Sequence, residues 1–365
     1  MKRNTLLLLM VFMAFNLAAQ TTWYNPQEEE RVVIHNQGWH EDGINYQRLP
    51  NRAKSEVRND LWNLSTESAG LSIRFKTNSS KITVKYEATG SYSMPHMPCT
   101  GVSGLDLYRE ADAAICFGSY SFNKDNVCYD YVINPVRSEQ GDFFTLFLPL
   151  YNGVKKLEIG VEDKASFEFI PVVNNRPIVV YGTSIAQGAC ASRPAMAWTN
   201  ILNRSLDYPV VNLGFSGNGK LEPEMLKLMG ELKARIFILD CLPNLTNMKR
   251  GAVKKLVKKA VEILREKRPD APILLVEHAG YADAKTNVDR FNAYNNCNVE
   301  QAEAYKELKE QGVKDLFYLN HDDIYLHQDS WVDATHPSNY GMKQQATAVE
   351  KKVRKIFRLQ EYKNL

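Results

Sequence analysis

The stretch Asn174-Asn-Arg-Pro-Ile178-Val-Val-Tyr-Gly182-Thr-Ser184 divides the chain into two halves with different hydrophobic periods. After it, continuous apolar runs alternate with long amphipathic segments. Strands that are apolar on both faces and alternate with helices form parallel sheets covered by helices on both sides. We therefore predict a three-layer α/β/α domain over residues 175–365. Its expected strands are Ile178–Tyr181, Val210–Leu213, Ile236–Leu239, Ile273–Val276 and Leu316–Leu319, with helices that include Lys249–Lys267, Asp289–Glu310 and Ser338–Phe357.

The half before this stretch, residues 21–174, has a period of two. Short alternating runs such as Leu71–Phe75, Lys81–Tyr86 and Phe143–Leu148 are separated by turns rich in Gly, Asn, Asp and Ser. Many short alternating segments with loops between them are typical of an antiparallel β-sandwich. We predict a jelly-roll-like β-sandwich domain here.

The first twenty residues indicate export. Lys2 and Arg3 precede an apolar run from Leu6 to Leu17, and the small residues Ala18 and Ala19 follow it. This order is typical of a secretory signal peptide, and the run is too short to span a bilayer comfortably. We expect residues 1–20 to be removed and the protein to be periplasmic or secreted, with no membrane span.

The composition of the 365-residue chain excludes several partners. It is 44% hydrophobic and 24% charged, with a net charge of only +3, so it is globular and lacks the field that attracts nucleic acid. The spacing of its six cysteines matches no zinc motif, and we expect no metal and no cofactor. The pairing of the cysteines and the oligomeric state stay open.

The first candidate for chemistry is Ser184, which directly follows the first predicted parallel strand. Functional residues of such sheets lie at the carboxyl ends of the strands. A serine there, at a helix N-terminus, is well placed as a nucleophile, because the backbone N–H groups favour a developing negative charge. The alternative is a serine that only caps the helix.

The second candidate is the pair Asp333 and His336, after the last strand and before a helix. A carboxylate three residues from an imidazole can fix its tautomer, which leaves the other ring nitrogen free to take a proton from a serine. An imidazole has an unperturbed pKa of about 6.5, which suits a base near neutral pH. The alternative is that both residues only cap the final helix.

Two further residues after strands can donate hydrogen bonds to an oxyanion. Gly217 follows the second strand and offers a backbone N–H, and Asn244 follows the third and offers its amide. Ester hydrolysis needs such donors about 3 Å from the developing oxyanion. The alternatives for the glycine segment are a simple turn or a dinucleotide fingerprint, and Glu222 stands where the fingerprint needs its third glycine.

Together, Gly182-Thr-Ser184-Ile, the Gly217 segment, Asn244 and Asp333-x-x-His336 resemble the four blocks of the SGNH (GDSL-like) hydrolase family, in order. The segment Gly104-Leu-Asp-Leu-Tyr108 also resembles the Gly-x-Asp-Leu-Tyr motif of a two-domain exported bacterial branch. This resemblance implies a flavodoxin-like hydrolase domain behind a β-sandwich.

The resemblance also implies the roles of the site residues. Ser184 is the nucleophile, His336 the base and Asp333 its orienting carboxylate, and the oxyanion hole consists of the Ser184 and Gly217 N–H groups and the Asn244 amide. Two departures stand out. Thr183 replaces the usual aspartate before the serine. Asn244 lies between a proline and a leucine instead of the usual glycine and aspartate.

Weaker candidates are His278 and Tyr181, which can contact substrate at the same sheet edge. The alternatives are a structural histidine and a core tyrosine. The acidic segment around His321 fits no standard metal site. Asp106, in an apolar surrounding, needs a partner if it is buried, and we expect a structural turn or an interdomain contact, with a direct substrate role as the less favoured alternative.

The sequence thus predicts a serine esterase that hydrolyses small acyl esters, above all acetyl esters on carbohydrates, through an acyl-serine intermediate. One alternative is a thioesterase or lipase-like enzyme that acts on longer acyl chains. Another is a glycan-binding protein without catalytic activity.

Overall fold

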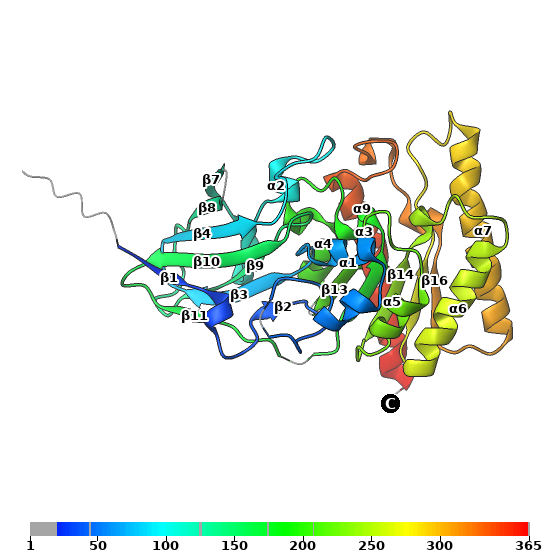
Figure 1. Ribbon diagram of the computed structural model, residues 1–365, viewed down its shortest axis with the longest axis horizontal. Helices are drawn as coiled ribbons and strands as arrows, with labels where there is room; N and C mark the ends of the chain where they lie inside the picture. The colour runs from blue at the N-terminus through cyan, green and yellow to red at the C-terminus, as the bar shows by residue number, and fades with distance from the viewer. Residues whose placement is uncertain (1–19, 44, 124–125, 174, 207, 364–365) are drawn as a thin grey trace, which may run out of the picture.

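A computed structural model describes residues 20–43, 45–123, 126–173, 175–206 and 208–363 (Figure 1). The predicted signal peptide, apart from Gln20, lies outside the described residues and stays a prediction. Among the described residues, no helix combines the length and the apolar character that crossing a bilayer requires.

The first half forms two antiparallel sheets that face each other across an apolar core. Alternating residues of the short strands point into this core, as the period of two predicts. One sheet has the order β1-β10-β4-β8-β7, with β1 Thr21–Tyr24, β10 Val154–Glu162, β4 Lys81–Ala88, β8 Val127–Val132 and β7 Gly118–Phe122. The other has the order β11-β3-β9-β5-β6, with β2 beside β3; the bounds are β11 Phe167–Phe169, β3 Ser72–Thr77, β9 Asp142–Phe147, β5 Asp106–Arg109, β6 Ala114–Cys116 and β2 Ile34–His35.

The second half contains a parallel sheet in the order β13-β12-β14-β15-β16. The chain enters at β12, moves to β13 on one side and then to β14 on the other. The strand order therefore reverses beside β12, and crevices at such switch points hold the ligands of open α/β sheets. The bounds are β12 Ile178–Gly182, β13 Val210–Gly214, β14 Ile236–Asp240, β15 Ile273–Val276 and β16 Leu316–Leu319.

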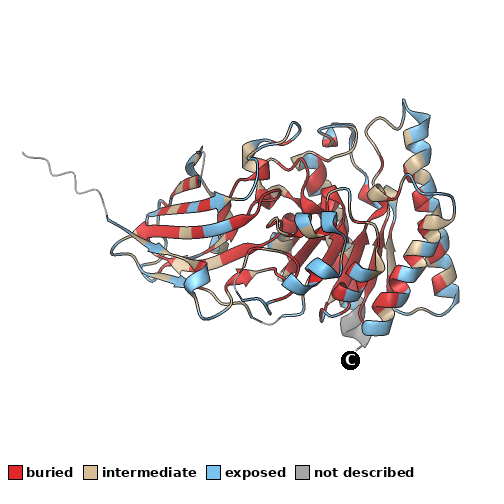
Figure 2. Cartoon of the chain, in the orientation of Figure 1, coloured by how far each residue is buried: buried red, intermediate tan, exposed pale blue. Residues whose placement is uncertain are grey.

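Helices cover both faces of this sheet, and its strands are buried apart from the two middle residues of the edge strand β16, which are partly exposed (Figure 2). Along β12, Val179 and Tyr181 face one helix layer, whereas Ile178 and Val180 face the other. The first layer contains α5 Pro223–Met229, α6 Ala252–Lys267 and α7 Val288–Glu310, and the second contains α4 Trp198–Ser205 and α9 Asn339–Lys363. The predicted fold class, a three-layer α/β/α domain behind an antiparallel β-sandwich, is confirmed.

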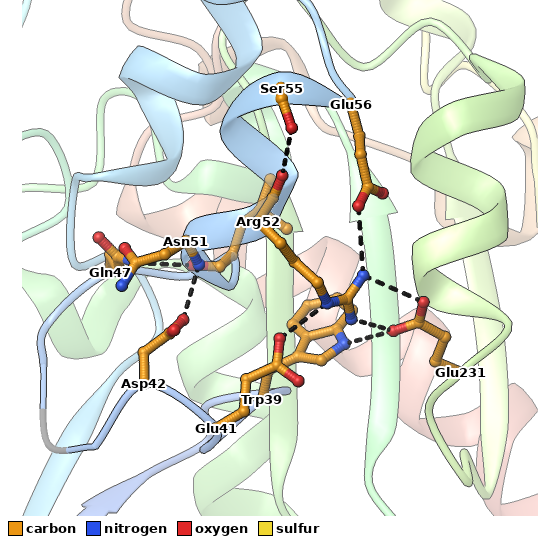
Figure 3. A network of polar contacts seen from close by, with 10 residues as sticks. Trp39, Glu41, Asp42, Gln47, Asn51, Arg52, Ser55, Glu56 and Glu231 are labelled. Atoms are coloured by element: carbon orange, nitrogen blue, oxygen red, sulfur yellow. Dashed lines mark hydrogen bonds and ion pairs between the residues drawn. The ribbon is translucent and has the colours of Figure 1, made fainter.

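The segment between β2 and β3 leaves the sandwich and packs against the α/β half. Leu49, Ala53 and Leu61 lie in the same apolar core as α5 and α6. At the surface above them, the Arg52 guanidinium binds the Glu231 carboxylate at 2.5 Å (Figure 3). The two halves therefore share a core, and the predicted boundary between residues 174 and 175 stays a prediction.

Candidate active site

Ser184 lies where β12 turns into a short helix, α3 (Ser184–Gln187). Thr183 caps this helix, because its hydroxyl accepts a hydrogen bond from the Ile185 N–H at 3.3 Å. The turn needs a glycine at position 182, since an added Cβ would lie 2.5 Å from the Cβ of Ala186. As the first residue of the helix, Ser184 has a backbone N–H with no carbonyl one turn before it.

The structure brings Ser184, His336 and Asp333 together. The Ser184 Oγ lies 2.9 Å from Nε2 of His336, and Nδ1 of the same ring lies 2.8 Å from Oδ2 of Asp333. Serine and histidine are 152 positions apart in the sequence. The expectation that residues from opposite ends of the α/β half meet at one sheet edge therefore matches the geometry.

The Asp333 carboxylate is fixed by its own loop. Its Oδ1 accepts hydrogen bonds from the backbone N–H groups of Thr335 and His336, both at 2.7 Å. Partial burial would raise the pKa of Asp333, but the hydrogen bonds from the His336 ring and from these two N–H groups outweigh it and hold the pKa below its usual range. Asp333 is therefore an ionised acceptor for the His336 Nδ1–H at neutral pH.

The Gly217 segment lies against the serine turn. The Phe215 N–H donates to the Gly182 carbonyl at 3.1 Å, and the Ser216 N–H donates to Oε1 of Gln187 in α3 at 2.9 Å. Gly217 itself has a φ of +68°, a left-handed conformation that favours glycine, and no described atom lies within 4 Å of an added Cβ. Its backbone N–H is thus on an exposed turn next to α3.

Asn244 is oriented by the same segment. Its Oδ1 accepts a hydrogen bond from the Gly219 N–H at 3.1 Å, which turns the amide NH₂ group away from that contact. The flanking proline lies in a single 3-10 turn, Leu242–Asn244, that ends at this residue. The proline before Asn244 and the leucine after it, which stand in place of the usual glycine and aspartate, therefore still leave an amide donor beside the Gly217 segment.

The two weaker candidates lie in the interior. Tyr181 is fully buried, and its hydroxyl donates to the Glu222 carboxylate at 2.5 Å. His278 is 1% exposed, and burial together with His321 and Arg290 lowers its pKa to about 3. These surroundings favour the structural alternative for both residues.

Asp106 of the Gly-x-Asp-Leu-Tyr segment makes the expected interdomain contact. It is buried, and its Oδ2 accepts hydrogen bonds from the Arg193 guanidinium at 3.0 Å and from the Ala195 N–H at 2.7 Å. Arg193 also donates to the Tyr108 hydroxyl at 2.9 Å. The motif of the first half therefore holds the segment that follows the serine helix.

Sequence reasoning missed two residues beside His336. The ring of His96, from a sandwich loop, lies 5.6 Å from the His336 ring, and the Cys190 thiol donates to the His96 carbonyl at 3.4 Å. No periodicity or spacing links these residues, because they come from three distant segments. The positive φ of Cys190, +67°, is visible only in the structure.

A cavity of about 470 Å³ lies elsewhere, between the two halves. Its walls include Arg74 and Tyr108 of the sandwich and Arg204 of α4, but none of Ser184, Asp333 and His336. Its lining also includes His35 and Ser72, but Nε2 of His35 contacts the Ile170 carbonyl at 2.8 Å and not a hydroxyl. This is a weaker indication of an ester-cleaving site than a serine hydrogen-bonded to an imidazole. We therefore place the candidate active site at Ser184.

The chain is similar to known proteins over both halves. Residues 175–354 match the family model described as GDSL-like Lipase/Acylhydrolase family, and residues 21–167 match the model described as N-terminus of Esterase_SGNH_hydro-type. No curated protein sequence matches the chain.

Three solved structures share the arrangement of both halves. A protein from Bacteroides ovatus ATCC 8483 described as a GDSL-like lipase is 30% identical, with a TM-score of 0.83 over 93% of this chain and 98% of that chain. The salicylyl-acyltransferase SsfX3 of a tetracycline biosynthetic pathway is 18% identical, with a TM-score of 0.72 over 92% and 97%. A family two carbohydrate esterase from Cellvibrio japonicus is 14% identical, with a TM-score of 0.57 over 92% and 98%.

Proposed function

Because the chain belongs to the GDSL-like lipase/acylhydrolase family and is an esterase, we propose that Ser184, His336 and Asp333 are its catalytic triad. We further propose that the substrates are small acyl esters, above all acetyl esters on carbohydrates. The observation that carries the triad is the pair of hydrogen bonds on the two nitrogens of one ring, 2.9 Å to the serine and 2.8 Å to the aspartate.

In the proposed reaction, Nε2 of His336 takes the proton of the Ser184 hydroxyl while Oγ attacks the ester carbonyl. The protonated imidazole then gives that proton to the leaving alcohol, and an acyl-serine remains. Water, deprotonated by the same ring, hydrolyses the acyl-serine and regenerates the hydroxyl. The ionised Asp333 keeps the Nδ1–H in place and stabilises the imidazolium that forms.

The tetrahedral intermediates carry a negative oxygen that needs donors. We assign this role to the backbone N–H groups of Ser184 and Gly217 and to the side-chain amide of Asn244. The hydrogen bonds that join the Gly217 segment to Gly182, and Asn244 to Gly219, support this assignment, because they fix donors before the substrate arrives.

The carbohydrate part of the proposal rests on two observations. The near-neutral chain has no strong field that selects a charged substrate. The Cellvibrio japonicus carbohydrate esterase shares the fold of both halves. We also propose that the protein is exported, as residues 1–20 suggest, which would bring it to extracellular acetylated glycans.

The experiment compares the wild type with Ser184→Ala on p-nitrophenyl esters of two, four and eight carbons and on acetylated oligosaccharides. We expect the variant to lose about four orders of magnitude in turnover or more. Ser55→Ala, at an exposed serine whose hydroxyl donates to a backbone carbonyl, is the matched control. Unchanged turnover in Ser184→Ala would overturn the triad.

The same assays separate the substrate alternatives. Acetyl esters should react fastest, because a small acyl site excludes longer chains. A preference for the eight-carbon ester would instead indicate a lipase-like enzyme. Only an unprotonated imidazole can accept the serine proton, so turnover should also fall in acid, and turnover that does not depend on pH contradicts a histidine base.

A further inference from the structure

Three side chains that can bind a metal meet at the edge of the candidate active site. They are His96 of the β-sandwich, Cys190 of the segment after α3, and His336 itself. Their ligand atoms all lie within 4.8 Å of one another. They come from segments more than ninety positions apart, so the sequence spacing gave no sign of a metal site.

Each of the three side chains can reach a shared ion. His96 is exposed, on a loop closed by the paired backbones of Met94 and Met97, and its ring is tilted by 31° relative to the ring of His336. Cys190 is buried, and its thiol makes a hydrogen bond to the His96 carbonyl at 3.4 Å. The His336 ring uses Nδ1 for Asp333 and presents Nε2 toward Ser184.

We propose that His96, Cys190 and His336 bind one Zn²⁺ ion, which reversibly blocks the esterase by occupying Nε2 of His336. The blocking rests on the proposed function, since it requires His336 to be the base. The binding itself does not, because it depends only on the three ligands.

The ligand set has the chemistry that zinc prefers. One thiolate and two imidazoles are soft-to-borderline ligands, and Zn²⁺ takes four of them in a tetrahedron. Bonds of about 2.0–2.3 Å place tetrahedral ligands ~3.5 Å apart, so the cluster must contract by about 1 Å. The exposed His96 ring, at the tip of its loop, can make this movement. A water molecule completes the fourth position.

The Asp333 carboxylate strengthens the site. A histidine that binds zinc usually donates its other ring N–H to a carboxylate, which fixes the tautomer and raises the basicity of the ligating nitrogen. The hydrogen bond from Nδ1 of His336 to Asp333 at 2.8 Å has this arrangement before any ion is bound. The contact that prepares the ring to accept a serine proton therefore also prepares it to bind a metal.

Binding involves no oxidation or reduction. The Cys190 thiol releases one proton to solvent as the S–Zn bond forms, and the neutral imidazoles each donate a lone pair. The hydrogen bond between the Ser184 hydroxyl and Nε2 is broken, so the serine loses its proton acceptor. A chelator removes the ion, and the thiolate takes back a proton.

The binding experiment uses Co²⁺ as a coloured substitute for Zn²⁺ on the full chain. We expect a near-ultraviolet thiolate-to-cobalt band in the wild type that Zn²⁺ displaces. Cys190→Ser should lose the band, and His96→Ala should need at least about tenfold more Co²⁺ to reach it. Ser184→Ala should keep the band, so the test stands even if the esterase mechanism is wrong.

The inhibition experiment titrates ZnCl₂ into p-nitrophenyl acetate hydrolysis. Wild type should be inhibited and recover with EDTA, whereas His96→Ala and Cys190→Ser should keep basal turnover and need at least about tenfold more zinc for half inhibition. His327→Ala and Cys128→Ser, outside the cluster, should behave as wild type. Equal zinc sensitivity of all variants, or no cobalt–thiolate band in the wild type, overturns the site.

Discussion

The serine side and the histidine side of the candidate active site are fixed in different ways. The serine side is buried: Ser184 is 8% exposed, and the Gln187 side chain at the end of the same helix is fully buried. The histidine side is open, with side-chain exposures of 39% for Asp333 and 18% for His336. One reacting group is therefore set in the core and its proton acceptor in a surface loop.

The serine side depends on contacts with the first half of the chain. The Tyr151 hydroxyl donates to the Ser184 carbonyl at 3.2 Å, and the Gln187 amide donates to the Leu150 carbonyl at 3.2 Å and to the Glu67 carboxylate. The buried Arg48 donates to the Gly214 carbonyl at the end of β13. The first half of the chain thus supports the turn that carries the nucleophile.

The histidine side is built within the α/β half. Arg290 of α7 donates to the Ala334 carbonyl at 2.9 Å and to the Thr335 hydroxyl at 3.0 Å. The Asp333 carboxylate itself accepts hydrogen bonds from two backbone N–H groups of the same loop. Changes on this side should therefore alter turnover with little effect on stability, whereas changes on the other side should alter stability first.

The largest effect that tests this contrast is expected for Asp333→Asn. An amide can no longer hold the required tautomer of His336, and we expect kcat to fall on the order of 10⁴-fold with p-nitrophenyl acetate. Because the lowered pKa keeps the wild-type Asp333 ionised well below neutrality, the loss should persist at every pH from 5 to 8. Asp329→Asn, at an exposed aspartate, is the control. A large loss of stability in Asp333→Asn would contradict the expectation that changes on the histidine side alter turnover rather than stability.

The second test changes two arginines that fasten the first half to the α/β half. Arg48 is 2% exposed and donates to the carbonyls of Leu64, Glu67 and Gly214. Arg48→Met leaves these carbonyls without their donor, and we expect the free energy of unfolding to fall by roughly 3–5 kcal/mol in urea denaturation.

The matched change is Arg52→Met in the exposed network of Figure 3, where the arginine side chain is 39% exposed. An ion pair open to water contributes little, so we expect a loss of at most about 1 kcal/mol. Equal losses of unfolding free energy in the two variants would show that burial does not make the contacts of Arg48 stronger than the ion pair of Arg52.

The difference between the two sides also explains what the sequence could predict. The strands of the α/β half were predictable because a strand buried on both faces is a continuous apolar run, and the observed β15 and β16 have the predicted bounds. Ser184 and the Asp333–His336 pair could be proposed because parallel strands end at one edge, which makes their meeting a consequence of topology.

The contacts between the halves could not be predicted in this way. Arg48 and Glu67 lie in a segment without a clear period, and their partners, Gly214 at the end of β13 and Gln187 after β12, come more than one hundred positions later. His96 and Cys190 meet His336 only because the sandwich packs on the α/β half. Such contacts leave no local pattern, since each partner looks like an ordinary surface residue in its own segment.

The smallest expected effect concerns Arg290, a positioning residue for the histidine side. Its guanidinium spans the Ala334 carbonyl, the Thr335 hydroxyl and the Asp283 carboxylate, and it lies 3.8 Å over the Tyr281 ring. A lysine keeps the charge but lacks the planar fork, so it cannot hold several acceptors at once. We expect Arg290→Lys to lower kcat about tenfold with KM unchanged, because the loop of Asp333 is less precisely placed.

The matched control for this variant is Lys285→Met, at an exposed residue of the loop before α7. Both variants should unfold within about 1 kcal/mol of the wild type, since a partly exposed ion pair contributes little. A mainly structural role of Arg290 would instead lower the stability and leave kcat of the folded fraction unchanged. That outcome would mean that changes on the histidine side, like those on the serine side, alter stability first. The expected outcome shows instead that the open loop of Asp333 places the catalytic groups, whereas the buried turn of Ser184 contributes to stability.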